Sequence, residues 1–323
     1  MAMTMTKLAR LANVSVSTVS KAFSGSSEIS DEKKEIIFNI AKETGCYDKF
    51  CKNTYNKSVI AVICPEFQSR YYSEQLTFLE REINKHNGTM IASSTDFDAK
   101  REEELVAFFS EHIKVDGIVL YEPQTRRKCS FPIVAIGFSE TYDSIYLSHR
   151  KALVEAVKHF AEYGHSNIAY LGDEHTSHIR ILFEEAMEKC KMTINKEYLI
   201  ENKDRFEMAG YEGMKKLLSF SNPPTAVLAA YDYIAIGAMK YIDEQGFKIP
   251  EDISIIGTDD IGETSYLNVP LTSITTYNED LSQIAVDAIF ERIRRKDNVP
   301  LKSIKVSTEL VKRGSVGRVK TET

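Results

Sequence analysis

One segment near the start of the chain, ANVSVSTVSKAFSG (residues 12–25), gathers hydroxyl groups and a lysine at helical spacing. Its valine, serine and threonine content alone is typical of a β-strand followed by a turn. A helix over the same residues has an apolar stripe, formed by Val16, Val19, Ala22 and Phe23. Its other side carries hydroxyl and ammonium groups, mostly from Ser17, Thr18, Ser20 and Lys21. Such a face offers hydrogen-bond donors and positive charge, which suit an anionic partner.

The distribution of charge points the same way. The chain of 323 residues has a net charge of −6, which by itself argues against nucleic-acid binding. Residues 1–58, however, hold nine Lys and Arg against six Asp and Glu, and the remainder holds 32 against 41. A small basic segment on an acidic body is expected when one module approaches phosphate and the other does not.

Two further helices are predicted around this polar face. The preceding helix has an apolar face made by Leu8, Leu11 and Ala12. Asn13 can adopt the left-handed conformation that ends it, and Ser15 is a good N-cap for the helix that follows. A third helix is capped by Ser30, has an acidic first turn that suits the helix dipole, and stops at Gly45. Three short helices with a tight turn between the first two predict a helix-turn-helix.

The rest of the chain alternates strands and helices. From residue 58 onward, apolar runs such as SVIAVIC, VDGIVL, PIVAIG, NIAYLG, TAVLAA and ISIIG are separated by amphipathic helical segments. This alternation predicts an α/β fold with parallel sheets covered by helices on both faces. Two such sets predict two doubly wound subdomains, with a cleft for a small ligand at the carboxyl ends of their strands.

Residues 6–45, with LARLANVSVSTVSKAFSG followed by EIS, closely resemble the DNA-binding head of the LacI/GalR (lactose-repressor) family. The body carries further family motifs in the family's order, namely YGHSNIAYLG, PPTAVLAAYDYIAIGAM, QGFKIPEDISIIGTDD, PLTSITT and TELVKR. The resemblance implies a periplasmic-binding-protein-like core behind the head. It also implies a homodimer on a pseudo-palindromic operator in double-stranded DNA. The function it implies is that of a transcriptional repressor controlled by a small-molecule effector, a sugar or sugar derivative.

The alternation and the resemblance together predict a head, a hinge, two discontinuous subdomains and a tail. The expected segments are the head at 1–46, the hinge or linker at 47–57, the N-subdomain at 58–164 and 277–300, the C-subdomain at 165–276 and 301–315, and the tail at 316–323.

Matching the motif assigns two sets of DNA contacts in the head. The side chains expected at base edges are Val16, Ser17 and Lys21, and those expected to donate to phosphates are Ser15, Thr18 and Ser20. Val16 offers apolar contact, for example to a thymine methyl group, whereas Lys21 reaches guanine acceptors. Packing inside the head is the alternative for Val16.

The hinge departs from the family. There, a short helix carries an Ala-x-x-Leu pattern whose leucines wedge into the minor groove and kink the operator. Here the segment is YDKFCKNTYNK (residues 47–57), which contains no leucine and is roughly three residues shorter. Either Phe50 or Tyr55 wedges instead, or the segment is an ordinary polar linker.

The resemblance also assigns candidate effector contacts, which are Ser69, Tyr71, Tyr72, Ser148, Arg180, Arg205, Asp232 and Asp259. Asp259 takes the place of a family carboxylate that accepts hydrogen bonds from sugar hydroxyls or ring nitrogens. Asp232 also matches, although a helix N-cap is its alternative role. Ser148 replaces a family aspartate or asparagine. Arg180 follows Ile179, which takes the place of a family arginine.

Arg205 lies where the family often has an aromatic roof over its ligand. Its guanidinium offers a planar fork of donors suited to phosphate or carboxylate, and Arg180 adds a second cation. These two residues predict an acidic or phosphorylated effector. In the alternative, Phe206 forms the roof and Arg205 points to solvent.

Motifs for other function classes are missing from the sequence. It has no G-x-S-x-G, P-loop or metal-spaced His/Glu set, and its cysteines never form Cys-x-x-Cys. His175 and His178, three residues apart, could hold a metal, but such pairs are commonly surface residues. We therefore expect no enzymatic activity, no metal and no cofactor.

The location of the protein is predicted from its hydropathy. No apolar run is long enough to cross a bilayer, and the N-terminus lacks the apolar region of a secretory signal. We expect a cytoplasmic protein with no membrane partner. The alternative function is a free-standing cytoplasmic small-molecule binding protein of the same core fold, which the head disfavours.

Overall fold

The computed structural model describes residues 3–24, 26–50, 57–113, 115–295 and 300–320. The chain divides into two compact units, Met1–Ser58 and Val59–Thr323, which we call the head and the core. No helix within the described ranges has the length and apolar character needed to span a membrane.

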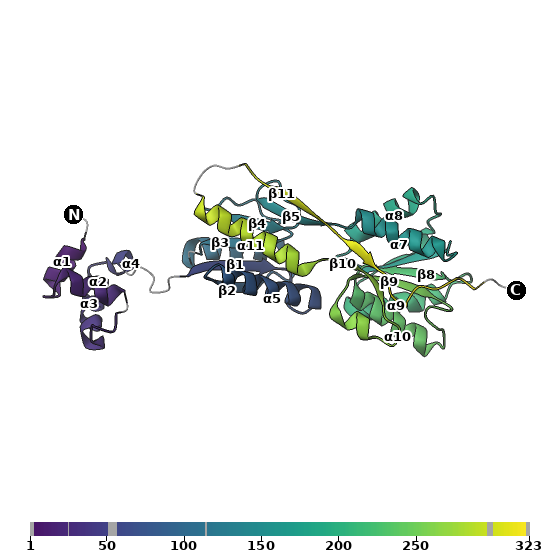
Figure 1. The fold of residues 1–323 in the computed structure, drawn as a ribbon, viewed down its shortest axis with the longest axis horizontal. Coiled ribbons are helices and arrows are strands. Elements are labelled where there is room, and N and C mark those ends of the chain that lie inside the picture. The colour runs from purple at the N-terminus through teal and green to yellow at the C-terminus, as the bar shows by residue number, and fades with distance from the viewer. Residues whose placement is uncertain (1–2, 25, 51–56, 114, 296–299, 321–323) are drawn as a thin grey trace. The chain divides into compact units, whose positions relative to one another are not determined.

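The head is built from helices (Figure 1), namely α1 (Met5–Leu11), α2 (Val16–Phe23), α3 (Asp31–Glu43) and the short α4 (Tyr47–Phe50). Asn13 has a φ of 52° between α1 and α2, and the Ser15 hydroxyl caps α2 by accepting from the Thr18 amide at 3.0 Å. Val19 and Phe23 are buried against α1 and α3. The helix-turn-helix prediction is confirmed, because packing of this apolar stripe overrides the local β-propensity.

The core contains two six-stranded sheets. The first sheet has the order β11-β5-β4-β3-β1-β2 and consists of β1 (Ser58–Cys64), β2 (Gly88–Ser94), β3 (Gly117–Tyr121), β4 (Ile133–Ile136), β5 (Asp143–Ser148) and β11 (Ser303–Ser307). The second has the order β12-β10-β9-β8-β6-β7 and consists of β6 (Ile168–Asp173), β7 (Leu199–Asn202), β8 (Ala226–Ala229), β9 (Ser254–Asp259), β10 (Thr272–Thr275) and β12 (Glu309–Val311). β12 runs antiparallel to β10, whereas β6, β7, β8, β9 and β10 pair in parallel.

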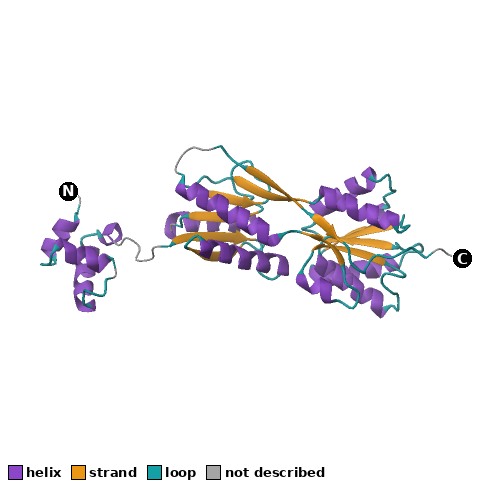
Figure 2. Cartoon of the chain, in the orientation of Figure 1, coloured by secondary structure: helices purple, strands orange, loops and turns teal. Residues whose placement is uncertain are grey.

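Helices cover both sheets (Figure 2). With the first sheet lie α5 (Arg70–Lys85), α6 (Ala99–Phe108), the π-helical turn η1 (Phe109–Ile113) and α11 (Asn278–Arg294). With the second lie α7 (Arg150–Glu162), α8 (Ser177–Lys189), η2 (Lys196–Tyr198), α9 (Phe206–Leu218), α10 (Asp232–Glu244) and η3 (Gly262–Tyr266). Alternate residues of β1 enter different apolar clusters, Ile60 and Val62 in one and Ala61 and Ile63 in the other. A strand buried on both faces is what the continuous apolar run SVIAVIC predicts, and the doubly wound α/β architecture is confirmed.

Three predicted segments lie elsewhere than expected. Helix α7, predicted in the N-subdomain, packs in the apolar cluster of the second sheet. Strand β11, predicted in the C-subdomain, pairs in parallel with β5 of the first sheet. Part of the predicted tail belongs to the second subdomain, since Val316 is buried there and the Val319 amide donates to the Tyr163 carbonyl at 3.0 Å. The chain thus passes between subdomains directly after β5, β10 and β11.

Candidate functional site

Helix α2 turns a polar face to solvent. Val16 is 42% exposed, so the alternative in which it packs inside the head is wrong. Ser15, Ser17 and Ser20 are exposed as well, and Thr18 is partly buried. Most of the side chains predicted to contact DNA are therefore accessible in the head.

Two of these side chains already have partners in the free head. The Ser15 and Thr18 hydroxyls lie 2.7 Å apart in a hydrogen bond at the start of α2. The Lys21 ammonium group forms an ion pair with Glu28, from the loop between α2 and α3. Lys21 must exchange this carboxylate for a base or phosphate if it contacts DNA.

The hinge residues have different outcomes. Phe50 is only 7% exposed, and its ring packs 6.1 Å from that of Phe23 in the apolar centre of the head. The hypothesis that Phe50 is an exposed wedge is therefore wrong for this conformation, because α4 continues the head. Tyr55 lies outside the described residues.

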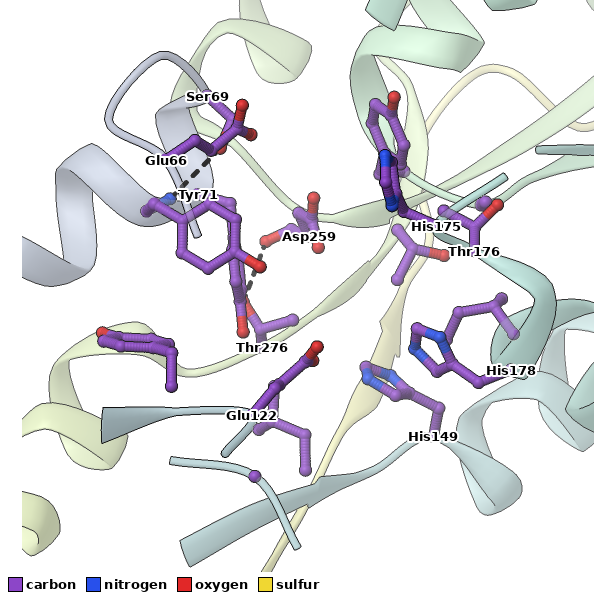
Figure 3. A pocket seen from close by; sticks show the side chains of 18 of the residues that line it. Glu66, Ser69, Tyr71, Glu122, His149, His175, Thr176, His178, Asp259 and Thr276 are labelled. Atoms are coloured by element: carbon purple, nitrogen blue, oxygen red, sulfur yellow. Dashed lines mark hydrogen bonds between the residues drawn. The ribbon is translucent and has the colours of Figure 1, made fainter. Parts of the chain in front are cut away.

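A cavity of about 520 Å³ lies in the core, lined by residues from both subdomains. This volume is within the usual range for small-molecule sites. Five predicted effector contacts line it, namely Ser69, Tyr71, Tyr72, Arg205 and Asp259. Figure 3 shows the side chains that converge on this space from strand ends and helix starts.

The first subdomain contributes the start of α5. Ser69 caps this helix by accepting from the Tyr72 amide at 3.4 Å, and this cap fixes the direction of the tyrosines that follow. The rings of Tyr71 and Tyr72 lie 5.0 Å apart, edge to face. Burial, followed by the nearby carboxyl groups of Asp259 and Glu122, raises the pKa of Tyr71, so its hydroxyl stays protonated.

Arg205 lines the cavity, but its charge is already compensated. Its two terminal nitrogens bond both carboxylate oxygens of Glu66, at 2.8 and 3.1 Å, and its Nε lies 3.8 Å from Asp173. The guanidinium also stacks 4.7 Å from the centre of the Phe97 ring and 4.5 Å from that of Phe206. Since Glu66 and Phe97 come from the first subdomain and Arg205 from the second, Arg205 ties the two sides together.

The prediction that Arg205 and Arg180 form an anion site together is therefore wrong, because only Arg205 lines the cavity. Arg180 does not line the cavity, and it pairs with Glu184 and, at 3.2 Å, with Glu201. Ile179 takes the cavity position instead. The alternative, in which Phe206 forms the roof and Arg205 points to solvent, is not observed either, because both residues line the cavity.

Ser148 and Asp232 also lie outside the cavity lining. The Ser148 carbonyl accepts from the hydroxyl of Thr308 at 3.2 Å, and the next residue, His149, faces the cavity. Asp232 is fully buried and accepts from the Ile261 amide at 2.8 Å and the Ser273 hydroxyl at 2.6 Å. These two hydrogen bonds hold the start of α10 against β10 and against the loop that follows β9. Asp232 is the first residue of α10 and not its N-cap, which is Tyr231.

Asp259 is the predicted carboxylate that does reach the cavity. It ends β9 and lines the cavity, with a φ of 102° that strains a residue other than glycine. Burial, with the charge of Asp232 adding to it, raises its pKa well above the usual range.

The cavity also holds polar residues that the sequence did not predict as contacts. Those with carboxyl or imidazole groups are Glu66, Glu122, His149, Asp173, His175 and His178. Glu122 and Asp173 stand at or just after the ends of β3 and β6, where ligand contacts concentrate in parallel sheets, so strand-end position is a signal that would have found them. Among the residues that the structure describes, no group of three or more His, Cys, Asp or Glu side chains could hold a metal ion.

The head and the core each match a protein family. Residues 4–47 match bacterial regulatory proteins of the lacI family, and residues 157–316 match the periplasmic binding protein-like domain. The ribose operon repressor of Haemophilus influenzae is 29% identical over 90% of this chain and 92% of its own length. The PurR repressor of Mannheimia succiniciproducens is 27% identical over 98% of this chain and 99% of its own.

Solved structures share the fold. The lac repressor dimer bound to operator and an anti-inducer superposes with a TM-score of 0.74 at 21% identity, over 98% of this chain and 100% of that one. A LacI-family regulator of Enterococcus faecium with bound ribose gives 0.69 at 23% identity, over 81% of this chain and all of its own. The curated relatives are transcriptional repressors, so the prediction that the chain is not an enzyme is confirmed. With this head followed by this core, the chain belongs to the lacI family of bacterial regulatory proteins.

Proposed function

We propose that this chain is a cytoplasmic transcriptional repressor that binds an operator as a homodimer. Helix α2 reads the DNA, and a small molecule in the core cavity sets the operator affinity. The observation that carries this proposal is the exposed face of α2, where Val16, Ser17 and Lys21 stand together without being needed for the head's packing. Val16 supplies apolar contact and Lys21 a cation for base edges.

The relatives support both halves of the proposal. The similar repressors carry the same head and core over nearly their whole lengths. The operator-bound lac repressor is a dimer, and dimers of this kind bind inverted repeats. The Enterococcus faecium regulator holds ribose, which makes a sugar derivative the first effector class to consider here.

A free-standing small-molecule binding protein is the second candidate. The cavity alone would suit it, since its size and lining fit a small ligand. That role gives no use to a separate head whose polar face is open to solvent. We therefore favour the repressor.

Selection of bound sequences from a random pool of duplex DNA tests the proposal. The full chain should enrich an inverted repeat and bind it about 10³-fold more tightly than scrambled DNA, the lower end of specific recognition. Val16→Ala should relax the preference at one symmetric position, because it removes an apolar contact. If no sequence is enriched, the free-standing binding protein is the better account.

A further inference from the structure

The charged groups of the cavity fall into two sets. In the first set, Arg205 is shared between Glu66 and Asp173, and Asp173 also accepts from the Tyr231 hydroxyl at 2.6 Å. Arg205 is the one Lys or Arg among the described residues that line the cavity. No Lys or Arg of the lining is therefore left for an anionic ligand.

The second set consists of Glu122 and Asp259. Within the described part of the chain, neither carboxylate makes a side-chain hydrogen bond or ion pair. Glu122, just after β3 in the first subdomain, is exposed to the cleft, and Asp259, at the end of β9 in the second, is partly exposed. Both groups are within reach of a ligand.

These two carboxylates face the same space from opposite subdomains. In Figure 3 the carboxyl groups of Glu122 and Asp259 and the hydroxyl of Tyr71 surround one open region of the cavity. Burial is the main cause of the raised pKa of Tyr71, and both carboxyl groups add to it, as expected for a phenol that lies near each of them. Tyr71 and Tyr72 add aromatic rings to the same region.

We propose that the effector is a cation, a hydroxylated small amine such as an amino sugar, whose ammonium group binds between Glu122 and Asp259 beside Tyr71. This inference rests on the proposed function and names its ligand class. The lining carries four carboxyl groups against one guanidinium, and a cleft with an excess of one sign of charge concentrates ligands of the opposite sign. An ammonium group also gains from the faces of neighbouring aromatic rings.

A neutral or anionic ligand fits the same groups less well. A neutral polyol can donate hydroxyls to both carboxyl groups, but it supplies no charge that would stabilise their ionised forms. An ammonium group does supply one, and it therefore favours the ionised form of Asp259 against the burial that raises its pKa. A phosphate would face Glu122 and Asp259 with Arg205 already bound to Glu66. Charge compensation therefore selects the amine.

His149 provides the second part of the ligand class. Its Nδ1 is buried and has no hydrogen-bond partner within the described residues. Burial, with His178 beside it, lowers the pKa of His149 to about 4, so the ring is neutral and can exchange a hydrogen bond with a hydroxyl group. An aliphatic amine without hydroxyls would leave this nitrogen unsatisfied.

Calorimetry on the full chain, without DNA, tests the proposal with matched probes. Glucosamine, galactosamine and mannosamine are each compared with two controls, the neutral parent sugar and the 6-phosphate of that parent sugar. At least one amine should bind at least about tenfold more tightly than its neutral parent, the value of one modest charge interaction, and the phosphate should bind more weakly still. Tighter binding of a neutral sugar or a phosphate, or no binding by any of the three amines, would overturn the proposal.

Variants locate the binding charge. Glu122→Gln and Asp259→Asn should each abolish the preference for the amine, while Glu188→Gln, the same change at an exposed position of α8 outside the cavity, should leave it intact. A preference that survives both cavity variants would also overturn the proposal. Selection of an operator is measured separately, so loss of the amine preference with operator binding retained refutes the ligand class alone. Amine binding by a chain that enriches no DNA sequence refutes the repressor alone.

Discussion

The head and the core each contain a cation that the sequence predicts as a ligand contact and that the structure shows in an ion pair. Lys21 and Glu28 in the head have side chains 43% and 66% exposed, whereas Arg205 and Glu66 in the core are 26% and 9% exposed. The core pair is bidentate, and its guanidinium also contacts two aromatic rings. The head pair is a single contact on the surface.

The difference decides which cation is available to a ligand. An exposed ion pair contributes about 0 to 1 kcal/mol, so DNA can displace Glu28 from Lys21 at small cost. Breaking a buried pair leaves a carboxylate without its partner and costs several times more. Lys21 is therefore free to change partners, whereas Arg205 holds the two subdomains together.

The largest expected effect comes from breaking the core pair. Arg205→Met should lower the free energy of unfolding by about 2 to 3 kcal/mol, because Glu66 stays buried without a cation. Urea denaturation of the full chain measures it. Arg126→Met, an exposed side chain in the loop after β3, serves as the control and should change stability by less than about 0.5 kcal/mol. If Arg205→Met and Arg126→Met lowered the stability equally, the core ion pair would contribute no more than an exposed arginine.

The matching change in the head acts on DNA binding. Lys21→Ala should weaken operator binding by about 1 to 3 kcal/mol and relax the preference at one symmetric base pair, if Lys21 leaves Glu28 to contact a base. Anisotropy titrations on the selected operator and its single-base variants measure both effects. Lys33→Ala on α3 removes the same charge elsewhere in the head. A uniform loss on all DNA with Lys21→Ala would make this residue a phosphate contact.

Asp232 extends the comparison to a buried carboxyl group that forms no ion pair with another described residue and whose hydrogen-bond donors are a backbone amide and a hydroxyl group. Burial raises its pKa from 3.8 to about 7. Between pH 4 and pH 7 the folded chain therefore binds a proton at Asp232 that the unfolded chain has released. The stability that this proton contributes is fully present below pH 4 and is lost as pH rises through 7. The stability of the wild type relative to Asp232→Asn should fall as pH rises from 4 to 7. Urea denaturation at several pH values measures this trend, and Asp243→Asn on the exposed side of α10 should not reproduce it.

The smallest effect is expected at the exposed pair itself. Glu28→Gln should change stability by less than about 1 kcal/mol, because the pair is open to solvent. It should strengthen DNA binding a few-fold, since Lys21 no longer has a competing carboxylate. Weaker binding by this variant would mean that Glu28 orients Lys21 for its contact.

Local spacing predicted the head well and the cavity poorly, for a physical reason. Asn13 and Ser15 act on residues within one turn of the helix, so their roles follow from the nearby sequence. The pairing of Arg205 with Glu66 joins positions 139 residues apart, and no local pattern contains it. Ion pairs of this kind exist only once the chain has crossed between the two sheets.

Errors of one residue account for other misses in the cavity. Ile179 rather than Arg180 faces the cavity, because one step along a helix turns the side chain by about 100°. His149 rather than Ser148 does so at the end of β5, where successive side chains point to opposite faces. The fold depends on the pattern of apolar residues, and this pattern is still recognised when a position is misassigned by one residue. A binding site is not, because it depends on which single side chain faces the ligand.

The central claim is that the state of the cleft controls operator binding. The ion pair between Arg205 and Glu66, which joins the two subdomains, tests this claim most directly. Operator affinity is measured by fluorescence anisotropy for the full-length wild type, for Glu66→Gln and for Glu188→Gln. Glu66→Gln weakens a contact between the subdomains within the core. It should change operator affinity at least about fivefold, the lower end of allosteric coupling, while Glu188→Gln stays within about twofold of the wild type. An operator affinity that Glu66→Gln leaves unchanged would contradict control of the head by the cleft.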